Sequence, residues 1–308
     1  MQVNVSQLVN MRKKTCLLIV LVFILSFILS GCSIEVREKQ DVPEAKYEKI
    51  GIAIKAGVSQ DGTINITYGM IGVKDNKICG VYLDQIEQNI QKKCHSLSNK
   101  ELKNSYGLSY KSDRGEWYQQ VEALENYIAG KHMTIDEINN LDVSSSKKGG
   151  IVPKKKSELG SACELDIAPF LEIINEAYNN LEDTNAEKMD VGETIGIRKN
   201  SGQLTFDVVF LALDYKEEIC YDKVKSFSIQ NSPRESSFIQ NESQNNELIG
   251  FENYIKGMKL SEVYNIETYD TGNGTDVAVP NKNTDLAEIC SIDLSRILRA
   301  LKECKFDS

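Results

Sequence analysis

Few side chains in this 308-residue chain have the types and spacing that catalysis needs. The chain has 2 histidines, His95 and His132, and this small number excludes a polyhistidine metal centre. His95 directly follows Cys94, but neighbouring side chains on a chain seldom face each other, so a surface loop explains this pair better than a Cys-His site. Neither a phosphate-binding glycine loop, nor a nucleophile elbow, nor a His-Glu-x-x-His helix occurs. We therefore lean towards a binding protein, although the sequence leaves enzymatic activity open.

The most suggestive local feature is a concentration of aromatic rings and glycines between residues 105 and 118. Tyr106, Gly107, Trp117 and Tyr118 belong to it. Such rings stack well on a planar ligand or a sugar. The simpler interpretation is that Trp117, the single tryptophan, anchors its helix on the core.

The N-terminal segment carries the most specific signal. Basic residues at positions 12–14 precede an apolar run over 15–29, and Leu29-Ser30-Gly31-Cys32 ends it. This order resembles the signal peptide and lipobox of bacterial lipoproteins, whose cysteine receives a diacylglycerol before the leader is cut off. The resemblance implies a signal peptide over 1–31, a lipidated Cys32 at the mature N-terminus, and a location on the extracytoplasmic face of the cell membrane. The alternatives are an uncleaved anchor helix or an ordinary cleaved signal with a chance cysteine, and Met11 is a second possible start.

Composition and charge limit the partners of the mature chain. A hydrophobic content of 41% with 26% charged residues is that of a globular protein. Loss of residues 1–31 removes three of 36 basic residues and none of 45 acidic ones, so the mature chain carries a net charge of −12. This charge excludes nucleic acid as a partner and repels an anionic bilayer. Residues 32–46 are charged and aperiodic, and we expect them to form a tether.

Six cysteines remain once Cys16 leaves with the leader and Cys32 is lipidated. None of them forms a Cys-x-x-Cys pair, so a zinc ribbon and a thioredoxin-like centre are unsupported. We expect mostly free, buried thiols. Cys94 and Cys304 are the expected exceptions, and the disulfide state stays open.

Two segments recur at an offset of 127 residues. Leu-Glu-Asn-Tyr-Ile-Ala-Gly at 124–130 returns as Phe-Glu-Asn-Tyr-Ile-Lys-Gly at 251–257, and Cys-Glu-Leu-Asp-Ile at 163–167 returns as Cys-Ser-Ile-Asp-Leu at 290–294. Repeated segments in one order at one offset indicate an internal duplication. We therefore predict two tandem modules, 47–183 and 191–308.

Each module begins with strand patterns and continues with helix patterns. Apolar residues alternate over 64–70 and 204–210, which predicts antiparallel hairpins with one face on a core and the other facing solvent or ligand. Helical spacing follows, with an N-cap at Asp113, a C-cap at Gly130 and a final helix opened by Asp166. We expect an α+β fold, with helices on one face of each small antiparallel sheet. Residues 228–247 are polar and predict a flexible surface loop.

This order of strand, Lys-Asp-Asn-Lys turn at 74–77, return strand, small-residue segment and final helix resembles the FMN-binding domain. In that family a Ser-Gly-Ala-Thr segment before the last helix carries flavin as a phosphoester on its threonine. Here the segment over 159–163 reads Leu-Gly-Ser-Ala-Cys, and 286–290 reads Leu-Ala-Glu-Ile-Cys. Since neither has the threonine, the resemblance implies non-covalent FMN at most, with Ser161 and Cys163 near it. The segments at 106–108 and 116–120 also resemble uncharacterised clostridial-type lipoproteins.

Three functions follow as hypotheses. The first is a non-catalytic, lipid-anchored binding or scaffold protein that holds a small planar ligand or a membrane or cell-wall partner protein. The second is an extracellular electron-transfer lipoprotein with non-covalent FMN. The third is a hydrolase acting on the cell wall, for which only scattered carboxylates speak.

Overall fold

The computed structural model describes residues 43–59, 61–89, 97–146, 149–197, 204–231, 236–239, 242–269 and 278–306. Contacts divide the chain into Met1–Glu44 and Ala45–Ser308, and the fold described below belongs to the second unit. The predicted signal peptide, Cys32, most of the tether, Cys94 and His95 lie outside the described residues.

The first sheet is antiparallel and has the strand order β3-β2-β1-β6. Its strands are β1 (Tyr47–Val58), β2 (Thr63–Lys74), β3 (Lys77–Asn89) and β6 (Glu182–Ala186). Asp75 and Asn76 have φ of +51° and +59° and join β2 to β3. Two residues with positive φ form the tight turn that suits the twist of a hairpin, so the predicted turn is confirmed.

The second sheet has the order β10-β9-β8-β7. Its strands are β7 (Lys188–Ile197), β8 (Leu204–Leu213), β9 (Ile219–Asn231) and β10 (Ser236–Ile239). The prediction of a flexible loop over 228–247 is wrong for the residues described there, because β9 extends to Asn231 and pairs with β10. Helix α7 (Glu242–Ile255) also begins within that range. Backbone pairing with β9 overrides the polar composition on which the prediction depended.

Helices cover the outer face of each sheet. Helices α3 (Trp117–Gly130) and α6 (Ala168–Asn179) pack on the first sheet, and α7 and α10 (Ser295–Glu303) pack on the second. Shorter elements complete the two layers: α2 (Asn99–Leu102), η1 (Lys103–Tyr106), α4 (Ile135–Asn139), β4 (Val143–Ser145), β5 (Ile151–Pro153), α5 (Glu158–Ala162), α8 (Leu260–Val263), β11 (Thr268–Tyr269), β12 (Val279–Pro280) and α9 (Leu286–Ile289). The expectation of a mixed α+β fold with helices on one face of each sheet is therefore confirmed.

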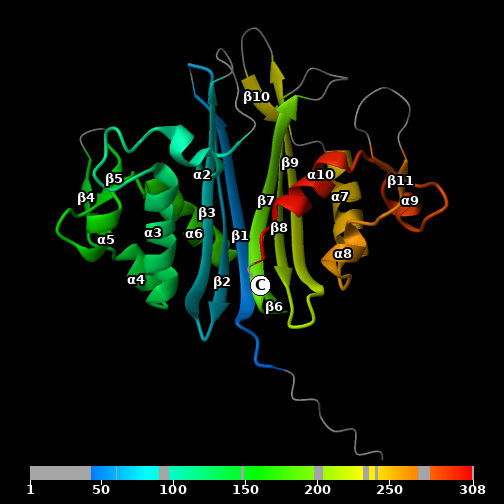
Figure 1. The fold of residues 1–308 in the computed structure, drawn as a ribbon, viewed down its shortest axis with the longest axis horizontal. Helices are drawn as coiled ribbons and strands as arrows, with labels where there is room; N and C mark the ends of the chain where they lie inside the picture. The colour runs from blue at the N-terminus through cyan, green and yellow to red at the C-terminus, as the bar shows by residue number, and fades with distance from the viewer. Residues whose placement is uncertain are drawn as a thin grey trace, which may run out of the picture. The chain divides into compact units, whose positions relative to one another are not determined.

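The inner faces of the two sheets pack against each other, which gives four layers in the order helix, sheet, sheet, helix (Figure 1). Tyr68 of β2 meets Phe210 of β8 edge to face, with ring centroids 6.4 Å apart. Every residue of β8 is buried. The expectation that one sheet face is open to solvent or ligand is therefore wrong, because each sheet covers the other.

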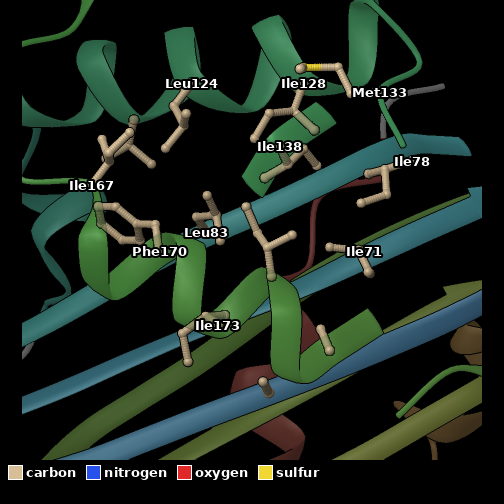
Figure 2. Packing of buried hydrophobic residues seen from close by; sticks show 14 of the residues in the cluster. Ile71, Ile78, Leu83, Leu124, Ile128, Met133, Ile138, Ile167, Phe170 and Ile173 are labelled. Atoms are coloured by element: carbon tan, nitrogen blue, oxygen red, sulfur yellow. The ribbon is translucent and has the colours of Figure 1, made fainter. Parts of the chain in front are cut away.

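A separate apolar core fills the space between the first sheet and its helices (Figure 2). Leu124 and Ile128 of α3 and Ile173 of α6 point towards Ile71 and Leu83 of the sheet. These helix residues are fully buried, as the 3.6-residue spacing predicts for the inward stripe of an amphipathic helix.

Helix boundaries differ slightly from the sequence expectations. Helix α3 begins after Glu116, whose N–H donates to the Gln119 side chain at 2.8 Å, so the N-cap lies at Glu116 and not at Asp113. Gly130 is its last residue, and the left-handed residue is His132, with φ of +50°. The Oδ1 atom of Asp166 accepts from the first N–H of α6 at 3.1 Å, which agrees with the expected capping role.

Several local arrangements occur in both halves of the unit. Leu83 N–H donates to Glu125 at 2.5 Å, and Val224 N–H donates to Glu252 at 2.7 Å. Cys79 and Cys220 each occupy a bulge at the start of the return strand. Further matched donor–acceptor pairs are Ile78 N to Met133 O and Ile219 N to Met258 O, Ile151 N to Asp166 and Ala278 N to Asp293, and Glu164 N to Gln120 and Ser291 N to Glu247.

The described cysteines are free thiols. Cys163, Cys290 and Cys304 are buried, while Cys79 and Cys220 are partly buried. Cys304 is one of the two expected exceptions, and the structure gives it no disulfide partner among the described residues. Burial, with the nearby charges of Asp190 and Glu193, raises the pKa of Cys304 well above its ordinary value, so this thiol is unreactive.

Candidate functional site

The aromatic segment is part of the first-half core. Trp117 is 4% exposed and packs on Phe170 and Tyr106, with ring centroids 6.0 Å and 5.9 Å apart. Tyr118 is partly buried against the same core. Gly107, with φ of +78°, follows η1. The structure thus brings Tyr106 and Trp117 together but surrounds the indole with protein, as the simpler interpretation expects.

The loop between η1 and α3 is fastened at its base by buried polar side chains. Glu116 accepts from Leu108 N–H at 2.7 Å and from the Ser109 hydroxyl. Gln120 donates to Ser112 Oγ at 3.0 Å. Tyr110 projects from this held loop and is 90% exposed.

Ser161 and Cys163 lie on either side of the end of α5. The exposed Ser161 hydroxyl donates to Glu158 O at 2.7 Å, while Cys163 is fully buried. Burial raises the pKa of Cys163 to about 11, so its thiol stays protonated. Arg114 donates to Gly160 O at 3.1 Å, which links this segment to the aromatic loop. These contacts place the two predicted segments next to each other but give Cys163 a structural environment.

An open groove of about 420 Å³ runs along α6 on the outer layer of the first half. Apolar side chains of Ile151, Ala168 and Leu171 line part of it. On its rim, Lys55 Nζ lies 2.9 Å from Glu172 Oε2, and the remaining lining residues are Asn175, Glu176 and Asn179. The sequence analysis missed this groove, although the spacing of polar residues at 172, 175, 176 and 179 marks one exposed helix face.

A smaller hollow of about 80 Å³ lies between α10, α7 and the second sheet. Its polar lining is dominated by Arg296, which pairs with Asp207 and donates from Nη2 to Thr194 O and Thr205 O at 2.9 Å each. Ser226 donates to the other Asp207 oxygen at 2.6 Å. These bonds fasten α10 to the sheet, so the buried ion pair serves packing.

The most unusual chemistry is a network of buried carboxyls that begins at Asp84 on β3. Asp84 is fully buried and accepts from Tyr68 OH at 3.3 Å and from Lys100 N–H at 3.1 Å. Burial raises the pKa of Asp84 to about 6, although the Lys100 charge opposes the shift. A carboxyl in this state exchanges a proton close to neutral pH.

Lys100 connects this network to α3. Its Nζ lies 2.7 Å from Glu125 Oε1 and 4.1 Å from the ring centroid of Tyr82. Burial raises the pKa of Glu125 to about 7, with Lys100 opposing the shift. Removing either partner of this pair would leave a buried charge without compensation.

Glu193 brings the second sheet into the network. It is 6% exposed on β7, and its Oε1 atom has no hydrogen-bond partner among the described residues. Burial, then the charges of Asp84 and Glu101, raise the pKa of Glu193 well above its ordinary value. Sequence reasoning could not find this network, because its members come from distant positions on five elements.

We expect the protein to become less stable as pH rises from 5 to 7.5. Asp84 and Glu125 have ordinary pKa values of 3.8 and 4.5 and raised values of about 6 and 7, so the folded state binds more protons than the unfolded state in this window. The free energy of unfolding should therefore fall by about 2 kcal/mol. Urea denaturation at both pH values measures it, and a stability that is constant or increases with pH would contradict the shifts.

The described part of the chain offers no group of three or more His, Cys, Asp or Glu side chains arranged to hold a metal ion. Among the same residues, no helix combines the length and hydropathy needed to cross a membrane. Comparison of the chain with models of protein families, with curated proteins and with solved structures found no match.

Proposed function

We propose that this chain is a lipid-anchored binding or scaffold protein on the extracytoplasmic face of the cell membrane, built from two tandem copies of one α+β module. The groove along α6 carries the binding part of the proposal. Its volume of about 420 Å³ lies within the range of small-molecule sites, and its combination of apolar lining and polar rim is typical of them.

The matched hydrogen bonds support the proposed duplication. Glu125 and Glu252 lie 127 residues apart, the offset of the repeated segments, and each accepts from a backbone N–H of the third strand of its sheet. Asp166 and Asp293 have the same offset and each cap a final helix. A common origin explains why unrelated surface sequences keep these buried contacts.

The anchor is tested by mass spectrometry of the chain isolated from the membrane fraction of its own cell or of a bacterial host that lipidates. We expect a mature chain that begins with diacylglyceryl-modified Cys32, because two acyl chains give stable membrane binding. The Cys32→Ala variant should lose the lipid and the membrane association. A wild-type chain that is unmodified, or that retains residues 1–31, would contradict the proposal.

The groove is tested in intact cells with a photo-crosslinking amino acid in place of Leu171. The matched control carries it in place of Ile249, which is 50% exposed on α7 of the other helical layer. Discrete adducts at position 171 and none at 249 would support a bound partner in the groove. Adducts at both positions, or at neither, would contradict binding there.

The two other function classes are tested on the purified full chain. Visible flavin absorbance, or quenching of Trp117 fluorescence on titration with FMN, would favour the electron-transfer hypothesis. Release of soluble products from peptidoglycan would favour the hydrolase. For a non-catalytic binding protein we expect neither.

A further inference from the structure

The buried carboxyl network lies on the seam between the two sheets. Asp84 comes from β3 of the first sheet and Glu193 from β7 of the second, and α2 supplies Ser98, at its N-cap, and Glu101. The side chains of Asp84, Ser98 and Glu101 all influence the Glu193 carboxyl. Helix α2 therefore touches both halves of the molecule.

The two sides of α2 are held very differently. Towards the first sheet, Lys100 donates from its backbone N–H to Asp84 and from Nζ to Glu125. Towards the second sheet, Glu101 faces Glu193, so two carboxyls meet with no cation between them among the described residues. A buried carboxylate pair is repulsive unless a proton is present.

Residue Lys103, directly after α2, has φ of +46°. A non-glycine residue in this region is strained, and strained residues often mark positions that change conformation. The contact between α2 and β7 is therefore bounded by a repulsive pair on one side and a strained joint on the other.

We propose that Glu193 and α2 form a proton-operated clasp: with a proton on Glu193 the clasp joins the two halves, and on ionisation α2 loosens from β7. The groups that face this site are Tyr68 on β2, Tyr82 and Asp84 on β3, Lys100 and Glu101 on α2, Glu125 on α3, Asp190 on β7, and Glu303, Cys304 and Lys305 at the C-terminal end. Among them only Lys100 and Lys305 are cationic, and Lys100 is paired with Glu125.

The direction of the effect follows from the two states of Glu193. In the closed clasp its pKa is raised, whereas in the loosened clasp the carboxyl is hydrated and has an ordinary pKa near 4.5. Between these two values the opening equilibrium should increase about tenfold for each pH unit. The clasp is thus closed in mildly acidic and opens in alkaline surroundings, independently of what the α6 groove binds.

Hydrogen–deuterium exchange of the full chain at pH 5.5 and pH 8.5, corrected for the intrinsic pH dependence of exchange, tests this proposal. We expect protection of the α2 amides to fall at least about tenfold more than protection of the β8 amides, which report global unfolding. In the Glu193→Gln variant, which keeps shape but cannot ionise, α2 protection relative to β8 should change less than about twofold.

Asp222→Asn is the matched control. Asp222 is another buried carboxyl, whose pKa burial raises to about 7, but it lies on β9 away from α2. This variant should keep the full pH response of α2. An α2 protection in the wild type that follows β8 at both pH values, or an unchanged response in Glu193→Gln, would overturn the proposal, and the wild-type comparison decides it even if the variant does not fold.

Discussion

Replacing Gly51 or Gly192 with alanine should destabilise the protein by about 3 kcal/mol or more. A Cβ atom on Gly51 would lie 2.0 Å from Ala177 O of α6, and one on Gly192 would lie 1.9 Å from Ala300 O of α10. Both obstacles are backbone atoms of a helix, so neither can move aside without displacing the whole element. Urea denaturation of the two variants measures the loss.

Gly57→Ala is the matched control for this prediction. Gly57 lies on β1, as Gly51 does, but nothing lies within 4 Å of the position that its new methyl group would take. We expect a change within about 0.5 kcal/mol, since alanine also reduces the entropy of the unfolded chain. If Gly51→Ala were as mild as this control, α6 could not pack as closely on β1 as the structure has it.

The second large effect is expected for Phe210→Ala, at about 3–5 kcal/mol. Phe210 is fully buried in the apolar layer between the sheets and contacts Tyr68 of the other half. Trp117, the single tryptophan, lies in the first half and reports on it by fluorescence. Because the sheets share one core, this substitution in the second half should lower the unfolding midpoint that Trp117 reports.

Tyr110→Ala provides the comparison, because Tyr110 is 90% exposed and its loss should change stability by no more than about 0.5 kcal/mol. The Phe210→Ala transition should be the same by Trp117 fluorescence and by far-ultraviolet circular dichroism. A fluorescence midpoint that stays at the wild-type value while the dichroism midpoint falls would mean that the halves unfold independently.

The sequence by itself determined the local elements. The alternation over 64–70 and 204–210 predicted strands, and the structure has β2 and β8 there. The spacing of Trp117, Leu124 and Ile128 predicted α3, and Thr134 with Glu137 predicted the cap of α4, in which the Thr134 side chain accepts from Glu137 N–H at 3.3 Å. These features depend on residues a few positions apart, so periodicity and capping preferences are sufficient to find them.

Only the tertiary structure decided what covers the inner face of each sheet. Period-two alternation shows that a strand has an apolar face, but the continuous apolar run at 208–213 was the signal that β8 is buried on both faces. Even that run does not identify the covering element. The association of two distant sheets does so, because each removes the apolar face of the other from water.

The carboxyl network depended on the tertiary structure still more. Asp84, Glu125 and Glu193 are ordinary acidic residues in the sequence, and nothing in their spacing pairs them. Folding moves them into a region of low dielectric on one seam, and the energetic cost of a buried charge then changes their pKa values. Residue type and spacing determined which groups this chain has, whereas their burial and proximity, which come from long-range packing, decided their chemistry.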